Sequence, residues 1–481
     1  MNYFCTYFLK MSKKKDKVQI IIEQVEILDF AAEAKCIVKI NDEVIFVQGP
    51  VAPGDICDLK ILRSKKKFKQ AQAINITPSS KFRTEVACSH FGVCGGCKWQ
   101  HVSYEAQLGF KTKQVKDNLE RIAKVPLPEF KEILGSEEQY YYRNKLEFTF
   151  SSARWLTNEE IGQEDLGSMN ALGFHVPGRF DKILEVNHCY LQPDPSNQIR
   201  NSVREFAEKN GISFYELKNQ KEGALRNLII RNASSGEWMV NVQFAYAEQF
   251  EIDLIMEHLK NNFPQITSLN YVINQKGNDT FHDLNVICYH GKPFIEEVME
   301  DLRFQIGPKS FFQTNTHQAL RLYQLVREYA DLSGNEIVYD LYSGTGTIAL
   351  FLANKTQKVV GLEYVEMAVE DAKMNAQHNG VENSSFFAGD MKKLLTDEFI
   401  SIHGKPDVVI TDPPRAGMDE DVVRQLLKVL PKTIVYVSCN PATQARDLAW
   451  LDEAYSVDVV HPVDMFPQTH HVENIVRLRL K

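Results

Sequence analysis

The sequence predicts a multidomain protein with a small OB-like β-barrel, an α+β central domain and a Rossmann-like α/β domain at its C-terminal end. The chain has 481 residues, enough for two to four domains at roughly 100–200 residues each. Short segments rich in β-branched residues fill positions 18–77, and strand-like and helix-like segments alternate from about residue 305. Such alternation is typical of a doubly wound sheet of parallel strands.

Composition places the chain among ordinary globular proteins. Hydrophobic residues make up 44% and charged residues 25%, which excludes a wholly disordered, collagenous or coiled-coil protein. No apolar run approaches the roughly 18–20 residues that span a bilayer, and the N-terminal residues lack the pattern of a signal peptide, so we expect no membrane association. Nine dispersed cysteines indicate a reduced, cytoplasmic protein, which we take to be a monomer. Met1 and Met11 are both candidate starts.

Charge is uneven along the chain. The formal net charge is -8. In residues 1–150, however, Lys and Arg outnumber Asp and Glu by 24 to 18, and in the remainder they are outnumbered by 45 to 31. A basic front end on an acidic body suggests an anion-binding appendage on a catalytic domain. Chance unevenness is the alternative.

These patterns divide the chain into four segments. We expect a flexible tail over 1–17, the barrel over 18–78, a central domain bearing a cysteine cluster over 79–304, and the α/β domain over 305–481. Five short strands predict the barrel. The run Lys65–Lys67 falls on its last hairpin, where it is either a phosphate-contacting tip or a solvated loop. The central domain is predicted to contain an antiparallel sheet, and a helix over about 103–124 to pack on the α/β domain.

The first strand of the α/β domain leads into a glycine-rich turn. VYDLYSGTGTIALFLA places Asp340, Gly344 and Gly346 between a strand and a helix, and small residues there let a ligand approach the backbone. Glu363 ends the next strand about 20 residues later, where a carboxylate can bind ribose hydroxyls. Asp390 ends a third strand and is either a helix cap or an adenine-side contact. Together these features predict a site for a nucleoside cofactor.

Three further motifs fall at the ends of later strands or near the C-terminus. VVITDPPRAG carries Asp412 and a stiff Pro-Pro loop, with Arg415 where amine methyltransferases place an aromatic residue, so amine methylation is disfavoured. TIVYVSCNPAT carries Cys439, either a nucleophilic thiol or a buried structural cysteine. QTHHVEN carries Glu473, a candidate general base, although a His-His-x-Glu sequence also suits zinc binding or a polar turn.

The D-x-x-x-G-x-G form of the glycine-rich turn resembles the first motif of the Rossmann-like methyltransferases that use S-adenosylmethionine. A cysteine, a carboxylate and such a methyl donor in one crevice suit one particular reaction. C5 of uracil is a poor nucleophile, but addition of a thiolate to C6 makes C5 enolate-like and able to accept a methyl group. A base must then remove the C5 proton so that the thiolate can leave.

With these residues in view, the chain resembles the RNA uracil-5-methyltransferases, specifically the iron–sulfur type that acts on 23S ribosomal RNA. The resemblance spans almost the whole chain, from an N-terminal barrel of the TRAM type to HHVEN. It rests on the ordered motifs FFQTN, DLYSGTGT, GLEYVEMAVEDAKMNA, DPPRAG, YVSCNPAT and HHVEN. The resemblance implies S-adenosyl-L-methionine as the cofactor, Cys439 as the nucleophile and Glu473 as the base.

The resemblance also assigns residues to two cofactor sites. With Gly344 and Gly346 of the turn, the positions that contact or border S-adenosylmethionine are Gln313, Tyr342, Thr347, Glu363, Asp390 and Asp412. Tyr342 stands where many relatives carry Phe, and Thr347 where some carry Asn. The four residues that match ligands of a [4Fe–4S] cluster are Cys88, Cys94, Cys97 and Cys189. Four thiolates with this C-x5-C-x2-C spacing and a distant fourth fit either a cluster or structural zinc.

The resulting hypothesis is S-adenosylmethionine-dependent C5-methylation of a uridine in 23S ribosomal RNA, with the target base flipped or already single-stranded. Aromatic residues are either base-stacking contacts or core residues, and we favour the core for each of Phe68, Phe91, Trp99, Phe311 and Phe312. The same chemistry on a uridine of the tRNA T-loop is the nearest alternative. A non-catalytic RNA-binding or assembly protein is the second.

Overall fold

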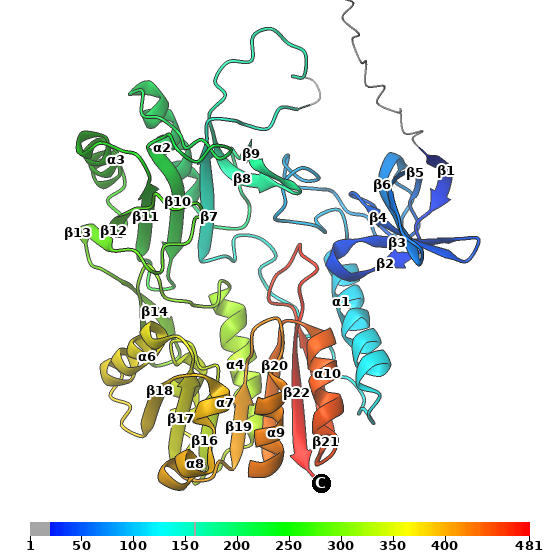
Figure 1. Cartoon of the computed structure of the whole chain (residues 1–481), viewed down its shortest axis with the longest axis vertical. Coiled ribbons are helices and arrows are strands. Elements are labelled where there is room, and N and C mark those ends of the chain that lie inside the picture. The colour runs from blue at the N-terminus through cyan, green and yellow to red at the C-terminus, as the bar shows by residue number, and fades with distance from the viewer. Residues whose placement is uncertain (1–19, 158–159) are drawn as a thin grey trace, which may run out of the picture. The chain divides into compact units, whose positions relative to one another are not determined.

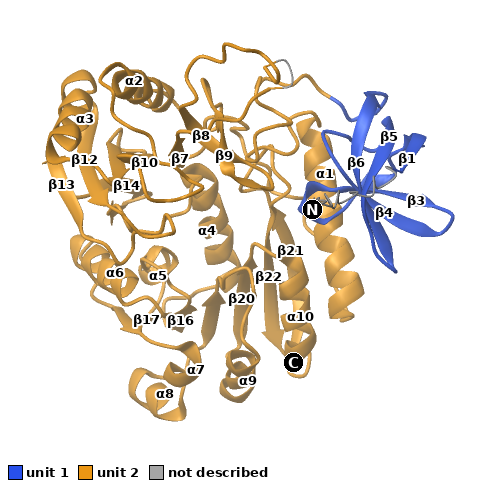
Figure 2. Ribbon diagram, turned by 45° about the horizontal axis from the view of Figure 1, so that its top comes forward, with its two compact units in different colours: residues 1–83 blue, residues 84–481 orange. Residues whose placement is uncertain are grey.

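The computed structural model describes residues 20–157 and 160–481, so the tail predicted over 1–17 lies outside the described residues. The chain divides into two compact units, residues 1–83 and 84–481 (Figure 2). Each unit has an apolar core of its own.

The first unit is a six-stranded β-module with the order β1-β5-β6-β4-β3-β2. Alternate residues such as Val38, Val47 and Leu59 fill its core. Its strands are β1 (Ile21–Glu26), β2 (Asp29–Phe30), β3 (Cys36–Ile40), β4 (Glu43–Gln48), β5 (Ile56–Ser64) and β6 (Phe68–Thr77). The sequence predicts five strands and misses β2, because a strand of two residues shows no alternation. Lys65–Lys67 lie exposed in the turn between β5 and β6.

The second unit begins with a cysteine-rich segment and helix α1 (Tyr104–Asn118), which continues as a π-helical turn over Leu119–Ala123. A seven-stranded sheet follows, in the order β13-β12-β11-β10-β7-β8-β9. Its strands are β7 (Lys145–Ser151), β8 (Ala171–Val176), β9 (Arg179–Glu185), β10 (Leu225–Asn232), β11 (Trp238–Phe244), β12 (Ile266–Ile273) and β13 (Val286–Gly291). Helices α2 (Ser196–Lys209) and α3 (Gln249–Asn262) cover one face. The predicted antiparallel pairing is interrupted between β11 and β12, which run parallel because α3 crosses between them.

A second seven-stranded sheet forms the C-terminal part of this unit, with the order β18-β17-β16-β19-β20-β22-β21 (Figure 1). A hairpin of β14 (Ile295–Met299) and β15 (Leu302–Ile306) precedes it. The strands are β16 (Ile337–Leu341), β17 (Lys358–Glu363), β18 (Ser384–Ala388), β19 (Val408–Thr411), β20 (Thr433–Ser438), β21 (Tyr455–Val463) and β22 (Glu473–Leu480). The first five are parallel, as the alternation predicts, but β22 is antiparallel to both of its neighbours.

Helices cover both faces of this C-terminal sheet. They are α4 (Thr316–Ala330), α5 (Thr347–Ala353), α6 (Glu366–His378), α7 (Met391–Leu394), α8 (Asp397–His403), α9 (Glu420–Val429) and α10 (Pro441–Leu451). One core contains α4, α5 and α6, and the other contains α9 and α10. Val115 and Leu119 of α1 belong to the second core, and α1 stands beside α10 (Figure 1). A helix from the first quarter of the chain thus packs next to the last two strands.

Candidate active site

β16 ends in a turn whose backbone is shaped for a ligand. Tyr342, Gly344 and Gly346 have positive φ angles of 63°, 53° and 77°. A Cβ on Gly346 would come within 2.9 Å of Ala372 and Phe386, so packing and backbone both require glycine there. A Cβ on Gly344 would meet no atom within 4 Å. The turn therefore leaves open space beside Gly344, whereas Gly346 packs closely against neighbouring side chains.

Acidic side chains support this turn. Glu363, at the end of β17, accepts a hydrogen bond from the N–H of Gly344 at 3.0 Å. The buried Asp340 accepts one from the N–H of Ala349 in α5, also at 3.0 Å. Burial, with the Asp412 carboxylate as a second cause, raises the pKa of Asp340 well above its usual range. Asp340 therefore fastens the strand to the helix, and Glu363 lies at the turn where the sequence places it.

Gln313 and Thr347 border the same turn. The segment that carries Gln313 contacts the turn through a hydrogen bond from the Thr345 hydroxyl to the Phe311 carbonyl, at 3.4 Å. Thr347 begins α5, and its hydroxyl lies 3.4 Å from that of Tyr323. Both predicted positions are thus next to the glycine turn, although they come from different parts of the chain.

Asp390 and Tyr342 make structural contacts. Asp390 caps α7 by accepting a hydrogen bond from the N–H of Lys392, so the cap is present whether or not the carboxylate also meets a cofactor. Tyr342 packs against the apolar core beneath α9 and α10, and burial raises the pKa of its hydroxyl to about 12. A cofactor contact by either side chain stays a prediction.

The loop that follows β19 and the loop that follows β20 are fastened to each other. The first carries Asp412 and Arg415, and the second carries Cys439 and Asn440. The Arg415 carbonyl accepts hydrogen bonds from the Asn440 side-chain amide at 3.0 Å and from the Thr443 hydroxyl at 3.2 Å. Since β16, β19 and β20 are adjacent parallel strands, these loops and the glycine turn meet at one edge of the sheet.

Strand register places Cys439 opposite Glu473. Ser438 at the end of β20 pairs with Asn474 of β22 in antiparallel register. The next residue along one strand is Cys439, and the preceding residue along the other is Glu473, so the two lie at the same end of the ladder. Directly opposed residues of an antiparallel pair are about 4.5–5.5 Å apart at Cα. The Gln444 side chain locks this end by donating to the Tyr436 carbonyl at 3.0 Å and to the Asn474 carbonyl at 3.1 Å.

Burial controls the charge of these groups. Glu473 is 8% exposed; its burial, with Asp412 as a second cause, raises its pKa to about 8, although Arg415 opposes the shift. Burial likewise raises the pKa of Asp412 to about 7. The pKa of the Cys439 thiol is raised to about 11 by burial and by the Glu473 and Asp412 carboxylates, again opposed by Arg415. The positive charge of Arg415 therefore favours the thiolate form of Cys439 and the ionised form of Glu473.

The four cysteines Cys88, Cys94, Cys97 and Cys189 line a single cavity of about 160 Å³. Burial raises the thiol pKa of Cys94 to about 11 and that of Cys97 to about 12. Among the residues that the structure describes, no three His, Cys, Asp or Glu side chains converge as the ligands of one metal ion do. The structure thus gathers the predicted set, and metal binding by it stays a prediction.

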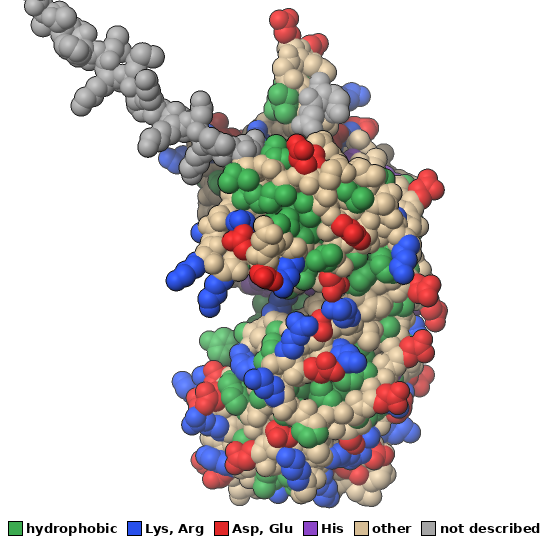
Figure 3. Space-filling view, turned by 90° about the vertical axis from the view of Figure 1, so that its right-hand side faces the viewer, with side chains coloured by type: hydrophobic (Ala, Val, Ile, Leu, Met, Phe, Trp, Pro, Cys, Tyr) green, Lys and Arg blue, Asp and Glu red, His purple; other side chains and the backbone are tan. Residues whose placement is uncertain are grey.

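The aromatic residues considered as base-stacking or core residues differ in their exposure. Trp99 is only 1% exposed and Phe312 only 5%, so these two are core residues, as the favoured interpretation of the sequence has them. Phe91 is half-buried with its ring 5.1 Å from that of His101, whereas Phe311 is 67% exposed. On the face shown in Figure 3, Lys and Arg are interspersed with Asp and Glu rather than gathered in one patch.

Sequence reasoning missed residues that hold the segment before Glu473. Gln107 and Lys111 of α1 hydrogen-bond to Gln468 and Asp464. Polar residues on a helix are ordinarily taken as solvent-facing, so their burial gives no local signal.

Within the described residues, 20–157 and 160–481, no helix is long and apolar enough to cross a bilayer.

Comparisons with known proteins agree with this geometry. The family model described as tRNA (Uracil-5-)-methyltransferase matches residues 291–481. A protein of Bacteroides thetaiotaomicron named an uncharacterized RNA methyltransferase is 56% identical over 455 residues, 94% of this chain and 100% of that protein. One of Chlorobaculum tepidum, also named an uncharacterized RNA methyltransferase, is 40% identical over 462 residues, 94% of this chain and 95% of its own.

A similar structure has also been solved. It is that of Pyrococcus abyssi tRNA (uracil-54, C5)-methyltransferase in complex with S-adenosyl-L-homocysteine, with a TM-score of 0.73 and 29% identity over 95% of this chain and 100% of that chain. The predicted enzyme is therefore confirmed as a methyltransferase over the non-catalytic alternative, and the family model covers the C-terminal sheet with its helices. The chain belongs to the RNA uracil-5-methyltransferase family.

Proposed function

We propose that this enzyme methylates C5 of a uridine in 23S ribosomal RNA, with Cys439 as the nucleophile and Glu473 as the base. The observation that carries the proposal is the register of β20 and β22, which sets the thiol and the carboxyl group at the same end of one ladder. A reaction that needs addition at C6 and proton removal at C5 needs two groups on neighbouring atoms of one ring.

The thiolate of Cys439 adds to C6, and the C5–C6 π electrons become an enolate spread over C5 and the C4 carbonyl. S-adenosylmethionine supplies the electrophilic methyl group that C5 then takes. Glu473 accepts the C5 proton, the C5–C6 double bond re-forms, and the Cys439 sulfur leaves with the electrons of its bond to C6. Arg415 favours the thiolate form of Cys439 and the ionised form of Glu473, since it lowers the pKa of both groups.

Residues around the glycine turn are proposed to hold the methyl donor. Gly344 offers open backbone, and Glu363 and Gln313 lie at its borders. Tyr342, Gly346, Thr347, Asp390 and Asp412 complete the proposed set. Burial raises the pKa of Asp412 to about 7. A neighbouring sulfonium cation would lower this pKa and so favour the ionised carboxylate.

The identity of the RNA rests on two kinds of support. The resemblance to the iron–sulfur type and the N-terminal β-module, which we propose to be of the TRAM type, favour 23S ribosomal RNA. The exposed Lys65–Lys67 turn of that module would contact phosphates. The named activity of the Pyrococcus abyssi protein, on tRNA, favours a tRNA uridine as the second candidate. In either case, we propose a cytoplasmic protein.

We propose that Cys88, Cys94, Cys97 and Cys189 hold a [4Fe–4S] cluster. Four thiols around one cavity suit a cluster, whose irons are spread over several positions, better than zinc, which draws four sulfurs to about 2.3 Å from a single point. When bound, the cluster would brace the segments around residues 88–97 and 189, because methylation itself transfers no net electron. Anaerobically purified protein should contain iron and sulfide and absorb near about 400 nm; a colourless preparation containing zinc would contradict the cluster.

The test of the chemistry is a covalent adduct with RNA that carries 5-fluorouridine, since fluorine cannot leave C5 as a proton. Wild-type protein with S-adenosylmethionine should form an adduct that survives denaturing electrophoresis, and Cys439→Ala should form none. Cys288→Ala, at an exposed cysteine in β13 outside the motifs, should behave as wild type. An adduct formed by Cys439→Ala would reject the proposed nucleophile.

The substrate is tested by mapping. Methylated uridines are compared in 23S ribosomal RNA and in tRNA from cells with and without the gene. A site lost from 23S RNA supports the first candidate, and a site lost from the tRNA T-loop supports the second.

A further inference from the structure

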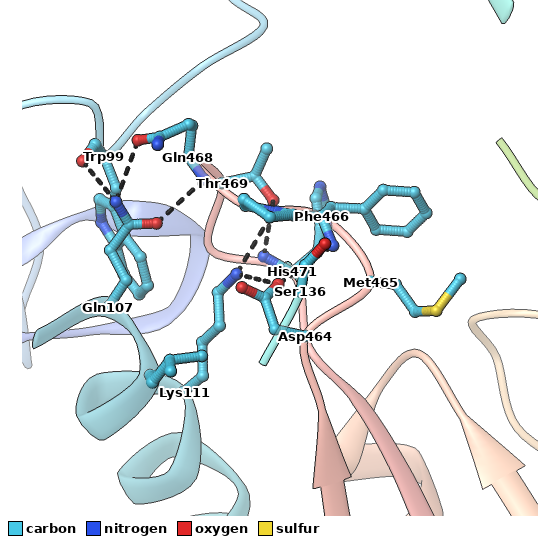
Figure 4. A network of polar contacts seen from close by, with 12 residues as sticks. Trp99, Gln107, Lys111, Ser136, Asp464, Met465, Phe466, Gln468, Thr469 and His471 are labelled. Carbon is cyan, nitrogen blue, oxygen red and sulfur yellow. Dashed lines mark hydrogen bonds and ion pairs between the residues drawn. The ribbon is translucent and has the colours of Figure 1, made fainter. Parts of the chain in front are cut away.

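One buried face of α1 is polar. Tyr104, Gln107 and Lys111 are spaced so that they lie on one side of the helix, and Gln107 and Lys111 have no exposed surface. Buried polar groups need hydrogen-bond partners. All three residues have partners in the loop between β21 and β22, residues 464–472, and Figure 4 shows those of Gln107 and Lys111. Gln107 also donates to the Trp99 and Val102 carbonyls, at 3.1 and 2.9 Å.

Lys111 fastens the start of that loop. Its ammonium group lies 2.6 Å from Oδ1 of Asp464 and donates a second hydrogen bond to the Phe466 carbonyl at 3.1 Å. The Tyr104 hydroxyl donates to Oδ2 of Asp464 at 3.0 Å. Both partners of the ion pair are completely buried. Such a pair holds its geometry firmly, because separating it leaves an uncompensated charge in the interior.

Gln107 fastens the middle of the loop through Gln468. Its Nε2 donates to Oε1 of Gln468 at 3.0 Å, and its Oε1 accepts from the Gln468 N–H at 2.9 Å. The Gln468 carbonyl accepts from the N–H groups of Lys98 and Trp99, at 2.9 and 3.0 Å. Gln468 has a φ angle of 66°, a left-handed conformation that is unfavourable for a residue other than glycine. These four hydrogen bonds hold it there.

The loop so held adjoins the base. Asp464 directly follows Val463, the residue that pairs with Glu473 across β21 and β22. The Tyr142 hydroxyl donates to the Pro467 carbonyl at 2.9 Å, which adds a contact from the central part of the chain. The loop that holds Cys439 is fastened by Arg415 and Asn440. Nucleophile and base thus share the β20–β22 ladder, and α1 adds a hold on the loop before the base.

We propose that Gln107 and Lys111 are positioning residues for Glu473. They fix loop 464–472 so that the carboxylate faces C5 while Cys439 holds C6. This inference rests on the proposed function and adds to it a division of labour between α1 and the β19–β20 loops. When α1 no longer holds loop 464–472, removal of the C5 proton should slow, and with it the release of methylated RNA. The addition of Cys439 to C6 should be unchanged.

The test separates addition from release in Gln107→Met, a change of similar size that removes the hydrogen bonds to Gln468 together with those to the Trp99 and Val102 carbonyls. Adduct formation is measured with a 5-fluorouridine transcript of 23S RNA, and with a tRNA transcript in parallel. Release is measured as turnover on the unsubstituted transcripts. A misplacement of about 1 Å costs on the order of 100-fold, so we expect kcat to fall about 10- to 100-fold, KM for RNA and adduct formation to change less than about twofold, and a Cys439–RNA adduct to accumulate on unsubstituted RNA.

Controls distinguish the outcomes. Gln114→Met, at the other glutamine of α1, should match wild type. If Gln107→Met does not fold, as judged by circular dichroism, Gln468→Ala is used, which removes the side-chain bond but keeps the backbone bonds, and the same split should appear. Normal release, or an equal fall in addition and release, overturns the positioning role. Absence of an adduct with wild-type protein would instead overturn the proposed function.

Discussion

The buried carboxyl group of Glu473 makes a quantitative prediction about stability. Its pKa rises from an ordinary 4.5 to about 8 in the folded protein, chiefly through burial. Below pH 4.5 the group is protonated in both folded and unfolded chains. As the pH rises from 4.5 to about 8, the unfolded chain loses this proton while the folded chain keeps it, so the stability of the fold decreases. Above about pH 8 the loss is complete.

The magnitude follows from the two pKa values. Each pKa unit corresponds to about 1.4 kcal/mol, so the loss amounts to about 3 kcal/mol at pH 7 and about 5 kcal/mol at pH 9. Glu473→Gln keeps the shape and removes the titration. The variant should therefore match wild type near pH 4.5 and exceed it in stability by a margin that grows with pH, while it loses turnover because no base remains.

Thermal melts of both proteins at pH 5, 7 and 9 measure this margin. In a chain this long, 1 kcal/mol corresponds to no more than about 2 °C in Tm, so the gap at pH 9 is expected to be several degrees and to close toward pH 5. Glu453→Gln, at an exposed carboxylate, is the matched control and should show a pH-independent difference. Parallel Tm curves for Glu473→Gln and wild type would refute the reasoning, since Glu473 would then be ionised in the folded protein.

Four further predictions concern other parts of the protein. Gly346→Ala brings a Cβ within 2.9 Å of Ala372 and Phe386 and should weaken S-adenosylhomocysteine binding by calorimetry more than tenfold. Gly344→Ala, which meets no neighbour in the protein, should cost about 1–2 kcal/mol of stability for its positive φ and should also weaken that binding, because its Cβ would enter the space proposed for the methyl donor. The rate constant kcat/KM should rise with pH through about 8 as Glu473 ionises and go on rising as the Cys439 thiol ionises; a fall between pH 6 and 8 contradicts the role of Glu473 as base. Cys97→Ser should lower the iron content of anaerobically purified protein, and unchanged iron would argue against Cys97 as a ligand. Replacing Lys65, Lys66 and Lys67 by Ala should weaken RNA binding and lower the slope of log affinity against log salt by about 2, with kcat at saturating RNA unchanged; an unchanged slope would show that this turn does not contact phosphates.

Much of the catalytic site could be predicted because its residues lie in local motifs at strand ends. Gly344, Glu363, Asp412 and Cys439 follow apolar strands in a βα alternation, and carboxyl ends of parallel strands necessarily meet at one edge of the sheet. The structure places all four there. The same reasoning predicted where Asp390 and Tyr342 lie in the fold but not what their side chains do. A side chain suited to contact a cofactor is equally suited to cap a helix, as Asp390 does, or to pack against the core, as Tyr342 does.

Other features depended on contacts that no local pattern encodes. The sequence does not show that β22 enters between β20 and β21 and runs antiparallel to both, yet this insertion sets Glu473 opposite Cys439. The aromatic ring of Trp99 is of the kind that stacks on RNA bases, but it is buried in the core. Exposure depends on what packs over a residue, and that is decided by chain segments far away in the sequence.

The sequence by itself led to the proposed reaction, because a thiol, a carboxylate and a glycine turn each occur in a motif whose strand–loop context can be read locally. Only the tertiary structure decided how the proposed nucleophile and base are held and charged. The buried polar face of α1 reads as a solvent-facing helix until residues 464–472 are packed against it. The pKa of Glu473 likewise depends on desolvation by neighbours distant in the chain, since electrostatic energies are set by distances in space rather than along the sequence.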